Sequence, residues 1–189
     1  NEVPSAKLEA LVGILAGLRL SGHSALVFRK FTDYLHSGRQ MMTSHGWSHC
    51  YLDGATPTAE RERLVNAFQS GEGDFFVISL KAGGTGLNLT SADYVILLDP
   101  WWNPAVENQA ADRAHRIGQK NPVTVYRLIA SDTVEERVLE QHLHRLGELD
   151  ELVVPARVAR DELLVHTVRA HLAPLVVVAA KPHLCDVLP

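Results

Sequence analysis

Several features that are common in other protein classes are scarce in this chain of 189 residues or missing from it. It has two cysteines, Cys50 and Cys185, whose separation fits neither a disulfide framework nor a zinc site, so we expect a reducing compartment. No apolar run approaches the roughly 18 to 20 residues that a membrane span needs, and the first residues lack a signal-peptide pattern. The formal net charge of -4 argues against nucleic-acid binding by bulk charge, so any such surface must be local.

The common phosphate-binding patterns are absent as well. The chain has no Gly-x-x-x-x-Gly-Lys-Ser/Thr loop, no Gly-x-Gly-x-x-Gly spacing and no Asp-Glu-x-His element, so it lacks the parts that grip a β-phosphate and Mg²⁺. His45, His49 and Cys50 have no fourth ligand at a suitable spacing, so we expect no metal site. The chain begins at Asn1 rather than at a methionine, so we expect it to be part of a longer protein.

Short apolar runs alternate with amphipathic segments along most of the chain. We expect helices at residues 6–20, 30–37, 57–69, 104–117 and 132–149, and strands at 25–28, 50–52, 75–78, 94–98 and 123–128. Thr56 is expected to cap the helix that opens at Pro57. Several strands are continuous apolar runs, which favour a sheet buried on both faces. The predicted fold is a doubly wound α/β domain with a mainly parallel sheet and helices on both faces.

The chain divides near its C-terminal end. Val154-Pro155 has the composition of a junction, so we expect one domain over residues 1–150 and a tail over residues 151–189. In the tail we expect a short helix at residues 161–172.

The predicted helix after Pro104 carries two stripes. Gln109, Arg113 and Arg116 lie at i, i+4 and i+7, roughly 50° to one side of the apolar stripe, and therefore at the rim of the core. Rim arginines either pair with acidic neighbours or present a planar fork that binds phosphate oxygens bidentately, and the spacing allows both. The apolar stripe consists of Val106, Ala110, Ala114 and Ile117.

Two further segments could bind a ligand. The glycine-rich segment 82–89 follows a predicted strand and is either a tight turn or a phosphate cradle, with Lys81 and Thr85 as natural phosphate partners. Trp101 and Trp102 stand between a strand and a helix, and either both rings pack or one is exposed.

Residues 79–119, SLKAGGTGLNLTSADYVILLDPWWNPAVENQAADRAHRIGQ, resemble motifs V and VI of the Swi/Snf-type ATPases, a branch of the superfamily-two helicases. The similarity continues through LVFRKFTDYL, YLDGATPTAERERLVNAF and YRLIASDTVEERVLE, and so spans residues 7–140. This resemblance implies that residues 1–150 are a helicase C-terminal domain, the second RecA-like lobe of a motor. The first lobe would hold ATP and Mg²⁺.

The resemblance also implies roles for single residues. Arg113 and Arg116 would be arginine fingers, with Gln109 in support and Gly84 and Gly86 at the nucleotide cleft. Contacts to the DNA backbone would come from Lys81, Ala82, Gly83, Thr85 and Trp102. Arg29 and Lys30 depart from the family pattern: they stand in Phe28-Arg29-Lys30-Phe31, where the family usually has Phe-Ser-Gln-Phe. These two adjacent charges either strengthen the contact with the DNA backbone or form a solvated pair.

The function that the resemblance implies is an ATP-dependent translocase on double-stranded DNA. The full-length protein would be the ATP hydrolase, and this chain alone would be inactive. HRIGQ, which ends at Gln119, favours this branch over RNA helicases, whose motif ordinarily ends in arginine. A helicase lobe of another superfamily-two branch and a non-catalytic scaffold remain alternatives. Expected partners are double-stranded DNA, the first lobe and DNA-bound proteins such as RNA polymerase, without a membrane. The expected location is cytoplasmic in a bacterium and nuclear in a eukaryote.

Overall fold

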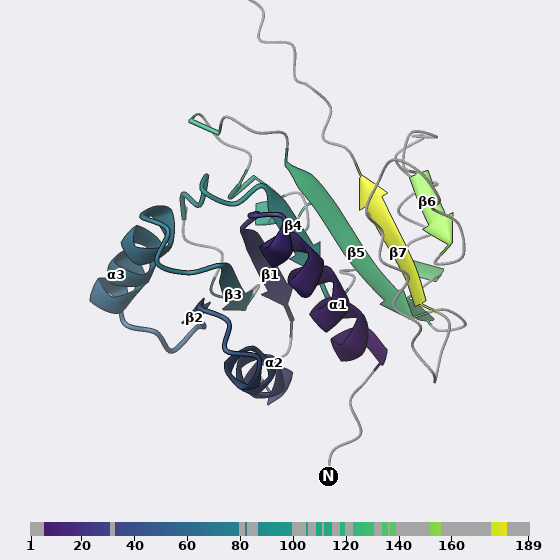
Figure 1. The fold of residues 1–189 in the computed structure, drawn as a ribbon, viewed down its shortest axis with the longest axis horizontal. Helices are drawn as coiled ribbons and strands as arrows, with labels where there is room; N and C mark the ends of the chain where they lie inside the picture. Colours follow the sequence, from purple (N-terminus) through teal and green to yellow (C-terminus); the bar gives the residue numbers. More distant parts are fainter. Residues whose placement is uncertain are drawn as a thin grey trace, which may run out of the picture.

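In the part of the chain that the structure describes, seven strands form one sheet (Figure 1). Their order across the sheet is β2-β3-β1-β4-β5-β7-β6. The structure, a computed structural model, describes residues 6–30, 33–79, 82, 87–99, 105, 109–110, 112–114, 118–119, 123–130, 134–135, 137–138, 152–155 and 175–180.

The first five strands pair in parallel, as the apolar runs predict. In β1, Leu26 lies opposite Phe76 of β3 on one side and Val95 of β4 on the other. A sheet of this kind requires crossover connections, and these carry the helices. The prediction of a doubly wound α/β domain with a mainly parallel sheet is confirmed. The strands are β1 Ala25–Arg29, β2 His49–Leu52, β3 Phe75–Ser79, β4 Tyr94–Leu97 and β5 Thr124–Ala130.

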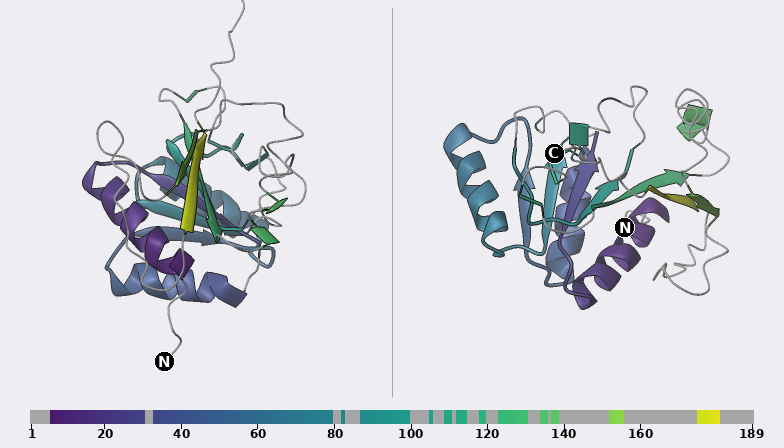
Figure 2. Two further views of the ribbon diagram at one scale, coloured as in Figure 1. Left: turned by 90° about the vertical axis from the view of Figure 1, so that its right-hand side faces the viewer. Right: turned by 90° about the horizontal axis from the view of Figure 1, so that it is seen from above.

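Helices cover both faces of the sheet (Figure 2). The side chains of a strand alternate between the two faces, so each face has its own core. One core joins α1 (Ala6–Leu20) and α2 (Asp33–Ser44) to Val27 of β1. The other core joins α3 (Thr58–Gln69) to Leu26 of β1.

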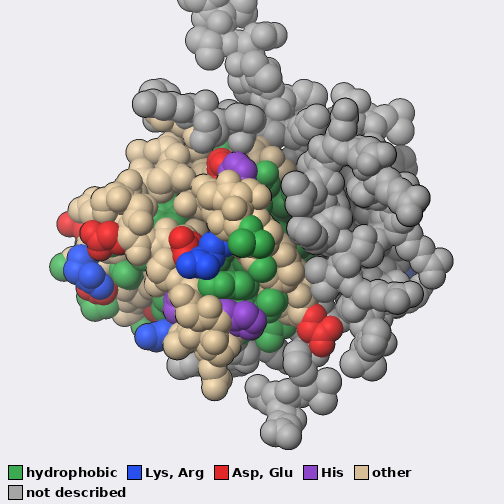
Figure 3. Space-filling view, in the orientation of Figure 1, with side chains coloured by type: hydrophobic (Ala, Val, Ile, Leu, Met, Phe, Trp, Pro, Cys, Tyr) green, Lys and Arg blue, Asp and Glu red, His purple; other side chains and the backbone are tan. Residues whose placement is uncertain are grey.

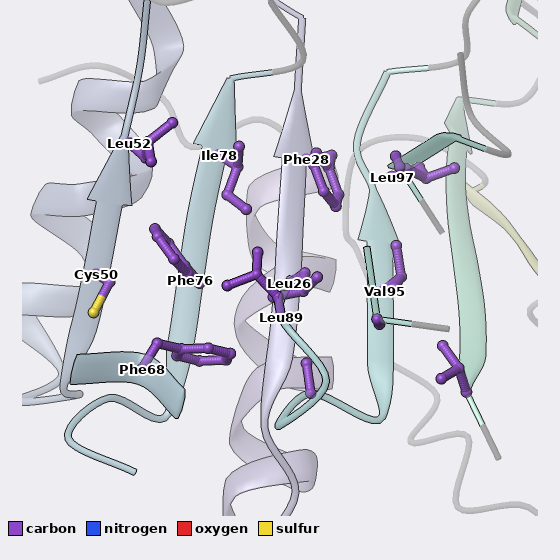
Figure 4. Close-up of a cluster of buried hydrophobic side chains, with 14 of the residues drawn as sticks. Leu26, Phe28, Cys50, Leu52, Phe68, Phe76, Ile78, Leu89, Val95 and Leu97 are labelled. Atoms are coloured by element: carbon purple, nitrogen blue, oxygen red, sulfur yellow. The ribbon is translucent and has the colours of Figure 1, made fainter. Parts of the chain in front are cut away.

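The core beneath α3 is the one that reaches the candidate site (Figure 4). Phe68 of α3 packs on Phe76 of β3 with ring centroids 5.3 Å apart. Leu89, Ala110 and Ala114 are buried in the same cluster, so the segments of motifs V and VI are anchored in one core.

Three helix expectations differ from the structure. The helix expected at residues 104–117 does not continue through residues 112–114, which form a turn. The second helix was expected at residues 30–37 but spans Asp33–Ser44, because Met41 and Met42 are buried in the core and packing outweighs the low helix propensity of Gly38. The expectation that Thr56 caps the next helix is wrong. Pro57 is the N-cap and makes no side-chain cap bond, while the Thr56 hydroxyl donates to Asp53 Oδ1 at 3.0 Å.

The C-terminal tail contributes two strands, β6 (Leu152–Pro155) and β7 (Leu175–Ala180). β7 pairs antiparallel with β5, and β6 pairs antiparallel with β7, so the tail extends the sheet. Val154 and Pro155, expected to mark a junction, lie in β6. The helix expected at residues 161–172 lies outside the described residues, and the division at residue 150 stays a prediction.

Candidate functional site

The loops of interest follow the carboxyl ends of neighbouring parallel strands. Arg29 ends β1 and lies opposite Ser79, which ends β3, while Phe28 lies opposite Leu97 at the end of β4. In open parallel sheets this is the edge where ligands bind. The segments that the sequence singled out therefore begin at one edge of the sheet.

The end of β1 is tied to the segment after β4. Asp99 Oδ2 lies 3.7 Å from Arg29 Nε and accepts a hydrogen bond of 3.0 Å from the backbone amide of Lys30. The Arg29 side chain is only 13% exposed. Asp99 thus offsets the charge of Arg29, one of the residues predicted to bind DNA.

The glycine-rich loop is described at one of its predicted contact residues, Ala82. Ala82 is buried, and its carbonyl accepts a hydrogen bond of 3.3 Å from Arg61 Nη1. At the start of the loop, the Ser79 hydroxyl is buried and has no hydrogen-bond partner among the described residues. The other predicted loop residues, Lys81, Gly83, Gly84, Thr85 and Gly86, lie outside the described residues.

Arg61 of α3 was not singled out from the sequence, yet it holds several parts of this site. Its Nε donates to the Thr56 carbonyl at 2.8 Å. Its Nη2 donates to the carbonyls of Asp53 at 3.1 Å and Gly54 at 3.3 Å. Bonds from a side chain to carbonyls leave no periodic pattern in a sequence. The one available sign was an arginine in the first turn of a helix that follows a tight turn.

The arginine-bearing segment packs closely against the sheet. Arg113 is 4% exposed, and its carbonyl accepts a hydrogen bond of 3.0 Å from the amide of Leu89. Ala110 and Ala114 are buried, as the predicted apolar stripe requires, and Gln109 is exposed. The position of Arg113 is deeper than the rim of the core that spacing indicates. Arg116 and Trp102 lie outside the described residues.

Gln119 braces the same segment from its far end. Its Nε2 donates to the Ala92 carbonyl at 2.7 Å and to the Ala114 carbonyl at 3.3 Å. The segment after the glycine-rich loop and the segment with Arg113 are therefore joined at two places, through Leu89 and through Ala92.

A turn rich in hydrogen bonds borders the site between β2 and α3. Asp53 Oδ1 accepts from the amides of Ala55 at 2.9 Å and Thr56 at 3.0 Å. Burial opposes ionisation of Asp53, but the bonds from Thr56, Ala55 and Tyr51 outweigh it and hold the pKa of this carboxyl below its ordinary value. A cavity of about 780 Å³ opens beside the turn, and its lining includes Thr56, Arg61 and Leu87.

The histidines and cysteines of the described residues form no metal-binding group of three or more. The Nδ1 atoms of His45 and His49 instead lie 2.9 and 3.0 Å from the carbonyls of Met41 and Trp47. Burial raises the pKa of the Cys50 thiol, which keeps it protonated and a poor metal ligand.

The parallel sheet, with its strand-end loops bonded to a buried arginine segment, has the architecture of a RecA-like helicase lobe. Residues 6–118 match the family described as Helicase conserved C-terminal domain, and the chain belongs to this family.

Similar proteins place the chain within one branch of the family. The human SWI/SNF-related matrix-associated actin-dependent regulator of chromatin subfamily A member 1 is 45% identical over 152 residues, which are 79% of this chain and 14% of that protein. The putative ATP-dependent helicase/translocase YwqA of Bacillus subtilis is 45% identical over 138 residues, 71% of this chain and 15% of that protein. The chain thus spans a small part of these relatives.

A solved structure supports the fold. The C-terminal part of the Fun30 ATPase domain matches with a TM-score of 0.67 and 31% identity, covering 85% of this chain and 47% of that one. The resemblance inferred from the motifs is confirmed: the chain is a helicase C-terminal lobe of the Swi/Snf-type ATPases.

Proposed function

We propose that this chain is the second motor lobe of an ATP-dependent translocase on double-stranded DNA. The observation that carries the proposal is the pair of joints between the two motif segments, Leu89 to Arg113 and Gln119 to Ala92. A motor must couple its nucleotide contacts to its DNA contacts. Direct bonds between the segment that carries the arginine and the segment that follows the glycine-rich loop give that coupling a short path.

Two described residues, Arg113 and Gln109, support a role in binding a nucleotide. Arg113 is a permanent cation held in a buried setting, where its attraction to a phosphate is weakly screened. The amide of Gln109 is exposed on the same segment and can bind an oxygen. When bound between the lobes, ATP supplies the phosphoryl group that is transferred to water. Arg113 and Arg116 would neutralise the charge that develops on that group. We assign Mg²⁺ to the first lobe, and Gly84 and Gly86 to the cleft.

DNA contacts are assigned to the loop residues Lys81, Ala82, Gly83 and Thr85, to Trp102, and to Arg29 and Lys30 at the end of β1. Because the chain is negative overall, these contacts must form a local patch. On the face in Figure 3, basic side chains of described residues lie beside acidic ones. Arg63 with Glu60 and Arg19 with Asp74 are pairs of this kind. Such pairs leave little net positive charge on this face to attract DNA.

The cellular location and the partners depend on whether the protein comes from a bacterium or a eukaryote. Two of the relatives come from Homo sapiens and Bacillus subtilis, so a nuclear and a cytoplasmic location both stay open. RNA polymerase as a partner has no support among the relatives and stays a prediction. Among the described residues, no helix has the length and apolar character to cross a membrane.

The test uses the full-length protein that contains this chain. ATP hydrolysis is measured without nucleic acid and with duplex DNA, single-stranded DNA or RNA. Duplex DNA should stimulate most, and ATP should drive displacement of a third strand from a triplex on the duplex. Stimulation by RNA would favour another superfamily-two branch, and no hydrolysis at all would favour a scaffold.

A further inference from the structure

The guanidinium of Arg61 binds carbonyls of two separate segments. Among the described residues, its acceptors Asp53, Gly54 and Thr56 belong to the turn between β2 and α3. Another acceptor, Ala82, belongs to the loop after β3 and lies 21 residues away in sequence. An arginine suits this task, because its planar fork has five N–H donors with fixed directions.

The turn does not depend on Arg61 for its closure. Asp53 Oδ1 already accepts from the amides of Ala55 and Thr56, and the Asp53 amide donates to the Thr56 hydroxyl at 3.1 Å. These bonds fix the turn from within. What Arg61 adds is the connection from an internally braced turn to the glycine-rich loop.

The place of this connection matters for the loop. Ala82 directly precedes Gly83 and Gly84 in the sequence, so a bond to Ala82 holds the chain where the glycine-rich segment begins. Ala82 is buried, and Arg61 anchors its carbonyl. Leu87, at the other end of the loop, lines the same cavity as Arg61 and Thr56.

We propose that Arg61 is a positioning residue that holds the glycine-rich loop against the turn between β2 and α3, so that the loop meets the DNA backbone in one position. The proposal rests on the proposed function for its effect on DNA. The anchoring itself can be measured independently.

The test compares Arg61→Met, which keeps the length of the stem and removes every donor, with Arg63→Met in the full-length protein. Arg63 is a matched control: it lies on the same helix, its side chain is 65% exposed, and it pairs with Glu60. Arg61→Lys is the conservative variant. It keeps the charge but loses the fork, so it should restore only part of the effect.

Hydrogen exchange tests the anchor. In Arg61→Met, amide exchange should rise about tenfold over residues 82–89, equivalent to about 1.4 kcal/mol of local opening. The amides of Ala55 and Thr56 should stay protected, because Asp53 holds them. Faster exchange confined to residues 53–56, or no change over residues 82–89, would overturn the proposal whatever the protein does with ATP.

Kinetics tests the effect on DNA. The duplex concentration that gives half-maximal ATPase stimulation should rise about tenfold in Arg61→Met, with the KM for ATP changed by less than about twofold. This concentration does not depend on the folded fraction, so simple destabilisation would leave it unmoved. An unchanged value in an active protein contradicts the proposal. A wild-type protein without DNA-stimulated hydrolysis contradicts the proposed function instead, and the exchange data still decide on Arg61.

Discussion

Replacing Gln119 by methionine should lower the free energy of unfolding of the lobe more than replacing an exposed glutamine does. The variant keeps the length of the side chain but removes the donor to the carbonyls of Ala92 and Ala114. Ala92 is fully buried, so its carbonyl has lost access to water. A buried acceptor left unsatisfied costs about 1–3 kcal/mol. The bond of 2.7 Å is the stronger of the two, and we expect a loss of about 2 kcal/mol in the free energy of unfolding.

Two further variants test the reasoning. Gln69 is an exposed amide that bonds Thr90 and Ser91 on the surface, so Gln69→Met should cost under about 1 kcal/mol. Gln119→Glu places a carboxylate against two carbonyls. At neutral pH it should lower the free energy of unfolding more than Gln119→Met does. Since those carbonyls and burial raise the pKa of the new carboxyl, this extra loss should shrink as the pH falls and the carboxyl is protonated.

Urea denaturation of each variant gives the free energies of unfolding. Equal losses for Gln119→Met and Gln69→Met would refute the account of a buried brace. A Gln119→Glu variant whose deficit does not change with pH would refute the account of the facing carbonyls.

Three other predictions follow. Asp53→Asn should lower stability at neutral pH, because the native pKa of Asp53 lies below its ordinary 3.8. That contribution is present above the unfolded pKa and lost as the pH falls through the native pKa, so the two proteins should converge below about pH 4, and a constant difference would contradict this. This chain alone should release no phosphate from ATP with excess duplex DNA, because it lacks a Gly-x-x-x-x-Gly-Lys-Ser/Thr loop; DNA-stimulated turnover would refute the division of labour between lobes. Its DNA binding should be weak, indifferent to sequence and steeply dependent on salt, as phosphate contacts are; a filter or anisotropy assay without a salt slope would count against the loop contacts.

The sheet could be predicted because its signals are local. Continuous apolar runs of four or five residues, such as 25–28 and 75–78, indicate strands buried on both faces wherever they pair. The period of Leu11, Leu15 and Leu18 likewise predicted α1, and all three residues are buried. The buried side of the helix could thus be predicted from the sequence without knowing which residues it packs against.

The parts that could not be predicted depend on distant partners. The pairing of β7 with β5 joins residues that are far apart in sequence, and an apolar run of six residues gives no sign of which strand it joins. The length of α2 was set by Met41 and Met42 against the core. Arg61 binds carbonyls, whose positions depend on the fold rather than on residue type.

The sequence indicated which segments lie together at this edge of the sheet, but not how deeply their side chains are buried. Spacing placed Arg113 at the rim of the core, and the structure buries it to 4% exposure. The helical wheel assumed a helix through residue 117, but residues 112–114 form a turn, so its angles do not apply at Arg113. The roles of Arg113 and Arg116 as arginine fingers therefore stay predictions that kinetics must test.

The most direct test of the central claim is the rate of a single ATP turnover in full-length protein with Arg113→Ala, scored per folded molecule on saturating duplex DNA. The account predicts a fall in this rate on the order of 10³-fold with little change in ATP affinity, because such an arginine acts on the transition state. Arg113→Lys should recover little, because lysine lacks the planar fork. A variant that unfolds more easily yet keeps its turnover per folded molecule would show that Arg113 is a buried structural residue, and would contradict the motor assignment of this segment.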